Sequence, residues 1–213
     1  MPAFQIKICG ITSPDDALEA TRAGADALGL NFFPGSARFL RPELARQIVG
    51  ALRGVPVLKV GLFVNSPPDA VARTCDELEL DLVQLHGDED PAYCSMLGER
   101  AIKALRVRGS TDLAEVDKYP CRAVLLDGYE NAGRGADGSG FDWRMVSVFD
   151  AGLPIIVAGG LTPDNVGKAI TTARPFGVDV SSGVEAAPGI KDPVLIYRFI
   201  EKARKVDYEV NGN

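Results

Sequence analysis

The chain has 213 residues, 46% of them hydrophobic, so it is long enough to bury one sizeable core. Its 23 basic and 29 acidic residues give a formal net charge of -6, and no basic stripe is present, which argues against nucleic acid as a partner. We find no linker and no shift of composition, and therefore expect one domain over residues 1–213. An anionic ligand must then be bound by local backbone N–H groups and one or two well-placed cations.

The sequence also predicts the compartment. The first ten residues, MPAFQIKICG, lack the apolar region of a signal peptide, and no apolar run approaches the ~18 residues of a membrane span. The four cysteines, Cys9, Cys75, Cys94 and Cys121, have no CxxC spacing. We therefore expect reduced thiols in a cytoplasmic protein with no membrane partner. His86 is the one histidine, which excludes a histidine-rich metal site.

Short apolar runs typical of strands alternate with helical patterns, and we count eight such units. The predicted strands are residues 4–9, 27–32, 58–64, 82–85, 101–107, 123–126, 155–158 and 177–180. Five of the predicted helices cover residues 42–53, 68–78, 91–97, 113–118 and 193–205. For the other three we predict only the start, which lies at Ser13, near Asp142 and at Thr162. Alternation implies a parallel sheet, and eight units favour a closed ring. The predicted fold is therefore α/β, a single-domain (β/α)8 TIM barrel.

Three of the predicted helices open with similar tripeptides, Ser-Pro-Asp, Pro-Pro-Asp and Thr-Pro-Asp. Proline is favoured at the first helical position because it lacks the N–H that would be unpaired there. In the seventh unit this places Thr162 at the N-cap and Pro163 at the first position. The recurrence supports a fold built from one repeated unit.

The ends of the seventh and eighth strands carry small residues that expose backbone N–H groups. These residues are Gly159, Gly160, Ser181, Ser182 and Gly183. In a (β/α)8 barrel the loops after these two strands commonly bind phosphate. The alternative is that the glycines only permit tight turns. Because two such ends lie one unit apart, we favour a phosphate site.

The first strand presents a cysteine at the mouth of the predicted barrel. Side-chain alternation sends Lys7 and Cys9 into the barrel and Ile6 and Ile8 towards the helices. A nearby ammonium group favours the thiolate, so Cys9 is a candidate base or nucleophile, with Lys7 beside it. The alternative is a small buried cysteine, and Cys75, Cys94 and Cys121 are interpreted in that way.

Acidic and polar side chains occupy inward positions on three other strands. Asp127 ends the sixth strand, Asp179 lies in the eighth, and Gln84 and His86 share the inward parity of the fourth. A carboxylate there is costly unless it has a partner or a function. The alternatives for each aspartate are a loop cap or an ion pair with Lys7 or an arginine. His86 is a candidate to orient a substrate or, equally, a structural histidine.

Two loops contain candidate ligand-binding residues. Arg38 follows the second strand, and its planar donors suit a carboxylate or a phosphate, although a surface arginine is an equal alternative. Residues 133–138 match the dinucleotide pattern G-x-G-x-x-G. We reject that interpretation because the glycines start several residues after the sixth strand instead of at a strand–helix turn. We expect a ligand-contacting loop instead.

Eight stretches considered together resemble one family. They are KICGIT (7–12), F-x-x-x-S-x-R (32–38), VGLFVN (60–65), VQLHGDE (83–89), LLDG (125–128), GFDW (140–143), AGGLTPDNV (158–166), and GVDVSSGVE with PGIKD (177–192). In this combination and order they resemble the phosphoribosylanthranilate isomerases of tryptophan biosynthesis, over nearly the whole chain.

The resemblance implies a (β/α)8 barrel that performs an Amadori rearrangement of N-(5-phosphoribosyl)anthranilate without a cofactor or a metal. It implies Asp127 as the general acid that opens the sugar ring and Cys9 as the general base at C2′. Arg38 would hold the anthranilate carboxylate, with Asp179 close to the ligand. Gly160 and the turn at 181–183 would hold the phosphate.

One departure from the family pattern and three rival functions remain. The loop at 135–140 lacks the lysine usual in the family and has Ser139 at the corresponding place. The enzymatic rivals are a related sugar-phosphate barrel, such as an epimerase or an aldolase with Lys7 as its Schiff-base nucleophile, and a histidine-pathway isomerase, which would use two aspartates. The non-enzymatic rival is a sugar-phosphate-binding barrel without activity. The sequence leaves a monomer and a homodimer equally open.

Overall fold

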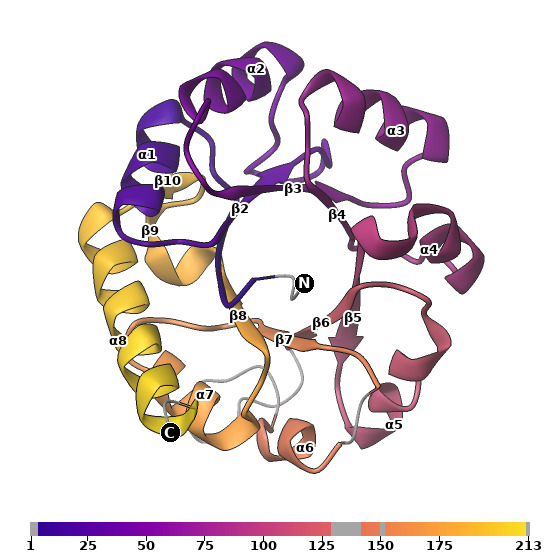
Figure 1. The fold of residues 1–213 in the computed structure, drawn as a ribbon, viewed down its shortest axis with the longest axis vertical. Helices are drawn as coiled ribbons and strands as arrows, with labels where there is room; N and C mark the ends of the chain where they lie inside the picture. The colour runs from indigo at the N-terminus through magenta and orange to yellow at the C-terminus, as the bar shows by residue number, and fades with distance from the viewer. Residues whose placement is uncertain (1–3, 129–141, 150–151, 212–213) are drawn as a thin grey trace.

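The structure, a computed structural model, describes residues 4–128, 142–149 and 152–211. Eight parallel strands close into a barrel in chain order, with helices around the outside (Figure 1). The barrel strands are β1 (Ile6–Cys9), β2 (Ala27–Asn31), β3 (Leu58–Phe63), β4 (Leu82–Leu85), β5 (Ala101–Val107), β6 (Ala123–Gly128), β7 (Ile155–Ala158) and β8 (Gly177–Val180). The predicted (β/α)8 barrel is therefore confirmed.

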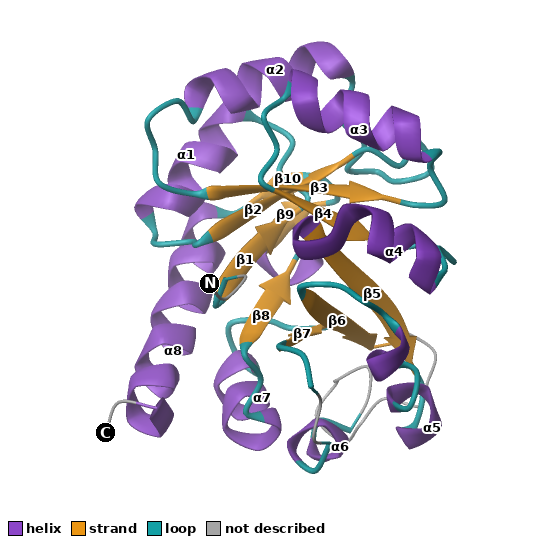
Figure 2. Cartoon of the chain, turned by 45° about the vertical axis from the view of Figure 1, so that its right-hand side comes forward, coloured by secondary structure: helices purple, strands orange, loops and turns teal. Residues whose placement is uncertain are grey.

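Helices connect successive strands and cover the barrel (Figure 2). They are α1 (Pro14–Arg22), α2 (Pro42–Ala51), α3 (Pro68–Glu77), α4 (Pro91–Leu97), α5 (Ser110–Leu113), α6 (Arg144–Ser147), α7 (Val166–Ala173) and α8 (Pro193–Asn211). Short 3-10 helices are η1 (Gly98–Arg100), η2 (Val116–Lys118) and η3 (Ser182–Val184). None of the helices in the described part of the chain is both long and apolar enough to cross a bilayer.

β1 closes the ring because it pairs in parallel with β2 on one side and β8 on the other. In this register Lys7 lies opposite Ala27 on β2 and opposite Asp179 on β8. The pairing of the first and last strands thus sets a lysine beside an aspartate at the seam of the barrel.

The core has two layers, as side-chain alternation predicts. The apolar part of the inner layer has side chains from Phe4 and from strands β2 to β7, for example Val60, Ile102, Leu125 and Ile156. The outer layer lies between the strands and the helices and includes Ile6, Ile8, Val124 and Leu126. The predicted inward and outward parities of β1 and β6 are therefore confirmed.

The capping of α1 is confirmed, whereas the predicted start of the seventh helix is wrong. Ser13 caps α1, and its Oγ accepts from the N–H of Asp16 at 3.0 Å. Helix α7 begins at Val166, three residues beyond the predicted Pro163. The reason is a turn held by Asn165, whose side chain accepts from the N–H of Thr162 at 2.8 Å and donates to the carbonyl of Gly160 at 2.9 Å.

The other main differences from the prediction lie in the fifth unit and after β8, while several further element ends differ by one or two residues. The fifth unit has two short helices, α5 and η2, instead of one over 113–118, and α8 extends to Asn211. Two short antiparallel strands, β9 (Glu185–Ala187) and β10 (Ile190–Lys191), were not predicted and follow η3. The hydroxyl of Thr12 donates to the carbonyl of Gly189, which ties this hairpin to the loop after β1.

Candidate active site

A pocket with a volume of about 530 Å³ opens at the carboxyl ends of the strands. It is lined by Cys9, Asn31, Arg38, Leu62, Gln84, His86, Arg106, Asp127, Gly128, Ala158, Gly159, Gly160, Leu161, Asp179, Val180, Ser181 and Ser182. Of the predicted site residues, Lys7 and Gly183 are the two outside this lining. Residues of all eight strands thus meet at one cavity, as the barrel fold requires.

The floor of the pocket beside β1 holds a buried ion pair. The Lys7 side chain is wholly buried, and its Nζ lies 2.9 Å from Oδ1 of Asp179. Burial by itself lowers the pKa of Lys7, but Asp179 and Cys9 together raise it above its ordinary value. Of the two alternatives for Asp179, the ion pair with Lys7 is the one that the structure contains.

The expectation that Lys7 makes Cys9 more acidic needs correction. Cys9 is buried, and burial raises the pKa of its thiol above the ordinary value. The Lys7 ammonium does lower the pKa of Cys9, as expected, but Asp179 raises it, and the net direction is upwards. Burial and Asp179 therefore outweigh Lys7 and disfavour the thiolate form of Cys9.

Three polar side chains form a chain along the wall at β4 and β6. The amide Nε2 of Gln84 lies 3.0 Å from Nδ1 of His86, and Nε2 of His86 lies 3.1 Å from Oδ2 of Asp127. Gln84 is wholly buried, whereas His86 and Asp127 are partly exposed to the pocket. His86 therefore contacts the candidate acid directly.

The glycine directly after β7, Gly159, leaves space for the carboxylate of Asp127. Gly159 has φ +85, and a Cβ there would lie 2.7 Å from Oδ1 of Asp127 and 2.4 Å from the backbone nitrogen of Gly128. Both the backbone conformation and the close approach require glycine at this position. Gly159 thus serves the geometry of the carboxylate as well as the turn.

Arg38 reaches the pocket from the loop after β2 and is held by a carboxylate. Its Nε and Nη2 donate to the two oxygens of Glu185 at 2.7 and 2.6 Å. Lys191, also buried, donates to Glu185 at 2.8 Å and to the carbonyl of Ser181 at 3.0 Å. Although burial raises the pKa of Glu185, the two cations bring it below its ordinary value. Sequence reasoning missed both Glu185 and Lys191, which lie in and beside the β9–β10 hairpin.

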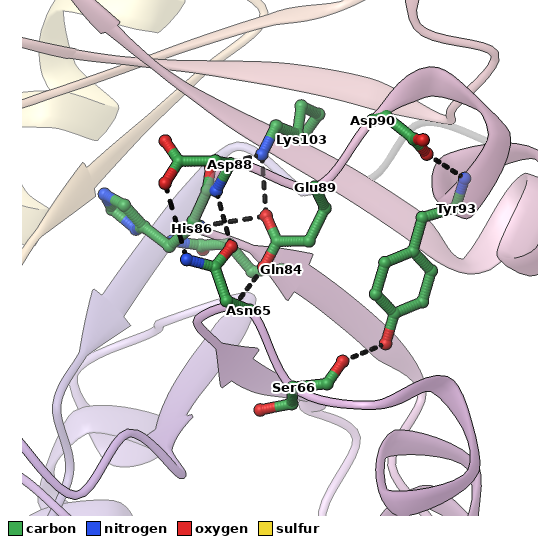
Figure 3. Close-up of polar contacts among 10 residues, drawn as sticks. Asn65, Ser66, Gln84, His86, Asp88, Glu89, Asp90, Tyr93 and Lys103 are labelled. Carbon is green, nitrogen blue, oxygen red and sulfur yellow. Dashed lines mark hydrogen bonds and ion pairs between the residues drawn. The ribbon is translucent and has the colours of Figure 1, made fainter.

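A second buried ion pair lies behind the loop that follows β4 (Figure 3). Lys103 of β5 donates to Glu89 and to the carbonyl of Gly87, both at 2.7 Å. Glu89 also accepts from the N–H groups of Gly87 and Asn65, at 2.9 and 2.8 Å. This network fixes the chain directly after His86. The sequence signal was a lysine at an outward position of the apolar strand AIKALRV.

Two sequence expectations are not tested by this geometry. The glycine-rich stretch 133–138 and Ser139 lie outside the described residues. Among the residues that the structure describes, no group of three or more histidine, cysteine or carboxylate side chains is arranged to hold a metal ion.

Fold and site together define a (β/α)8-barrel enzyme with a polar pocket at the carboxyl ends of its strands. The sequence model of the N-(5'phosphoribosyl)anthranilate (PRA) isomerase family matches residues 6–202. The chain belongs to this family.

Relatives and solved structures agree with this assignment. The N-(5'-phosphoribosyl)anthranilate isomerase of Citrifermentans bemidjiense is 50% identical over 202 residues, covering 95% of this chain and 98% of the relative. The crystal structure of phosphoribosyl anthranilate isomerase from Thermotoga maritima superposes with a TM-score of 0.84 at 39% identity, covering 95% and 99% of the two chains. A further structure, with TM-score 0.81, 38% identity and the same coverage, is a complex with reduced 1-(o-carboxyphenylamino)-1-deoxyribulose 5-phosphate.

The Glu89–Lys103 pair predicts a specific pattern of stability. Lys103→Met should lower the free energy of unfolding by about 3–5 kcal/mol, because it leaves the Glu89 carboxylate buried without its cation. The double variant Glu89→Gln/Lys103→Met should lose less, since no charge is then left unpaired. Urea denaturation measures both.

The matched control is the exposed pair Glu115–Lys118. Lys118→Met should change the free energy of unfolding by less than about 1 kcal/mol, as for surface pairs in general. Equal losses for Lys103→Met and Lys118→Met would contradict the importance of the buried pair.

Proposed function

We propose that this chain catalyses the Amadori rearrangement of N-(5-phosphoribosyl)anthranilate to 1-(2-carboxyphenylamino)-1-deoxyribulose 5-phosphate, the isomerisation step of tryptophan biosynthesis. The observation that carries the proposal is that Cys9 and Asp127, from the ends of β1 and β6, line one pocket. An acid and a base on different sides of a bound sugar can open its ring and then move a proton. The ligand of the 38% identical neighbour is a reduced form of this product.

Asp127 acts first, as the general acid. Its carboxyl group gives a proton to the furanose ring oxygen, the bond from that oxygen to C1′ breaks, and the nitrogen lone pair forms the C1′=N bond of a protonated Schiff base. Asp127 suits this role because its side chain is partly exposed to the pocket and is held by His86. After this step Asp127 is left as a carboxylate.

Cys9 acts second, as the general base. Its sulfur removes the proton from C2′, the electrons form the C1′=C2′ bond, and those of the C=N bond return to nitrogen to give an enolamine. Tautomerisation of the enolamine yields the ketone. Lys7 is wholly buried behind Cys9 and Asp179. We therefore assign Lys7 the role of stabilising charge at these two residues, and not contact with the substrate.

The two ends of the substrate are anionic and need separate sites. At one end Arg38 and Lys191 face the single carboxylate of Glu185, which leaves one net positive charge for the anthranilate carboxylate. Asp179 and His86 line the space between the two ends, where the ribose hydroxyls would lie. Binding both ends fixes the sugar between the acid and the base.

The phosphate would lie between the ends of β7 and β8. Gly160 has φ +66, and neither its N–H nor those of Ser182 and Gly183 donate to a backbone carbonyl of the described residues. Unpaired N–H groups that converge in this way bind oxyanions. Gly159 and Ser181 complete the two turns.

The acid–base assignment predicts large losses of turnover. Cys9→Ser and Asp127→Asn should each lower kcat by about 10²–10⁴-fold, because each removes one proton-transfer group. Consumption of the substrate, made in situ from anthranilate and phosphoribosyl pyrophosphate, is followed by anthranilate fluorescence.

Cys75→Ser is the control, since Cys75 is a buried cysteine of α3 outside the pocket and should leave kcat unchanged. A wild-type chain that binds the product analogue without consuming the substrate would favour the non-catalytic barrel. Full activity in either variant would refute the role of that residue.

The raised pKa of Cys9 predicts the pH dependence. The thiolate is the base, and burial raises the pKa of the Cys9 thiol above its ordinary value, so the fraction of thiolate in the free enzyme should keep rising from about pH 7 to 9. The rate at which iodoacetamide inactivates the free enzyme should follow this fraction, up to tenfold per pH unit. An inactivation rate that is level across this range would show that the pKa of Cys9 is not raised.

The proposed phosphate site predicts that adding one methyl group at Gly183 lowers kcat/KM strongly. A Cβ at position 183 would lie 1.8 Å from the carbonyl oxygen of Leu161, so Gly183→Ala must displace the end of β8 from β7. A shift of about 1 Å can cost on the order of 100-fold in kcat/KM, and inhibition by inorganic phosphate should weaken in parallel. Gly50→Ala, on the surface of α2 with open space around its Cβ, is the matched control and should keep wild-type values.

A further inference from the structure

Hydrogen-bond contacts join Gln84 to His86 and His86 to Asp127, and the mechanism above gives Gln84 no role. Each contact is of hydrogen-bond length, 3.0 Å to Nδ1 and 3.1 Å from Nε2, and so both ring nitrogens of His86 are engaged. Figure 3 shows Gln84 and His86 beside the Glu89–Lys103 network that holds the following loop. His86 is thus fixed in position on two sides.

We infer that Gln84, acting through the tautomer of His86, controls where the proton sits on the His86–Asp127 pair, which makes both residues positioning residues for the acid. This inference deepens the proposed function and rests on it for the role of Asp127. It also changes the expectation that His86 binds substrate, because the Nε2 atom that faces the pocket is directed at Asp127.

The direction of the hydrogen bonds in the resting state follows from the amide. Nε2 of Gln84 can only donate, so Nδ1 of His86 must accept. In a neutral imidazole the proton then lies on Nε2, which donates to the Asp127 carboxylate. The structure therefore assigns the Nε2–H tautomer to His86 when Asp127 is ionised.

Loading the acid reverses these roles. Nδ1 takes up one proton from a hydronium ion of the solvent, which becomes water, and the proton previously on Nε2 moves to Oδ2 of Asp127. Nε2 now accepts from the carboxyl group, and Nδ1–H needs an acceptor in place of a donor. The amide of Gln84 supplies that acceptor by rotating half a turn, which brings its Oε1 to Nδ1.

The present surroundings of Gln84 fit this double role. The side chain of Gln84 is wholly buried, and yet its Oε1 accepts no hydrogen bond from the described residues. A carbonyl in this state is costly in a purely structural position, where an apolar side chain would serve better. Glutamine is the side chain that offers a donor and an acceptor at one place to the two tautomers.

Other charged groups face the acid from the neighbouring strand. Arg106 of β5 is the register partner of Asp127 and also lines the pocket. Its guanidinium remains charged throughout, so it favours the Asp127 carboxylate after the proton has been given up. Among the described residues, the two ring nitrogens of His86 are contacted by Gln84 and Asp127. Of these two groups, Gln84 is the one that can change from donor to acceptor without a change of charge.

The test uses the fact that the chain has one histidine. Protein labelled with ¹⁵N and freed of any histidine tag gives two-bond ¹H–¹⁵N correlations from His86 alone. In the wild type without ligand we expect the Nε2–H pattern. In Gln84→Glu the carboxylate can only accept, so the pattern should change to one with a proton on Nδ1. In Gln84→Met the Asp127 carboxylate alone still favours Nε2–H, and the signals should move part of the way towards the Nδ1–H pattern.

Turnover is measured on the same samples. Gln84→Met should lower kcat by roughly 10- to 100-fold, as for other groups that orient a functional histidine, with KM almost unchanged. Gln47→Met, an exposed glutamine of α2, is the matched control and should retain both the wild-type kcat and the Nε2–H pattern.

The outcomes separate this inference from the proposed function. An Nδ1–H pattern in the wild type, or a loss of kcat in Gln84→Met without a change in the His86 signals, overturns the inference. Should Gln84→Met fail to fold, the wild-type pattern and Gln84→Glu still decide. A wild type that has the Nε2–H pattern but does not consume the substrate supports the tautomer assignment and overturns the proposed function instead.

Discussion

The pairing of β1 between β2 and β8 is the constraint on which the site depends. Closure of the ring fixes the side-chain parity of every strand, because one residue of slip would turn the inner layer outwards. It also brings together residues from the two ends of the chain, so that Lys7 lies against Asp179 and Cys9 shares their surroundings. A site made from the first and last strands exists only in the closed barrel.

Buried charges support the functional side chains at three places around the rim. Lys7 holds Asp179, Glu185 and Lys191 hold Arg38, and Lys103 with Glu89 holds the loop after His86. Burying a charge is costly, and a close partner offsets the cost only in one geometry. These ion pairs therefore fix the positions of the neighbouring side chains more than they raise the free energy of unfolding. They also explain how a chain with net charge -6 can offer a local positive site for an anion.

The sequence predicted features that depend on local pattern and missed those that depend on distant partners. Strands β4, β5, β7 and β8 have the predicted bounds, because apolar runs of strand length with defined ends leave few alternatives. The Arg38–Glu185 pair joins residues 147 positions apart, and no local pattern indicates it. The sign of the Cys9 pKa shift was missed for a related reason: Lys7 was visible in the sequence, but the degree of burial was not.

Burial of Cys9 also orders the two steps of the proposed reaction. The thiolate of Cys9 is disfavoured, because burial and Asp179 outweigh the effect of Lys7. Ring opening by Asp127 creates a cationic nitrogen at C1′, next to the proton that Cys9 must remove. That positive charge favours the thiolate and at the same time makes the C2′ proton more acidic. A base that is weak in the free enzyme thus becomes effective only after the acid has acted, which protects a buried thiol from reacting before the substrate is in place.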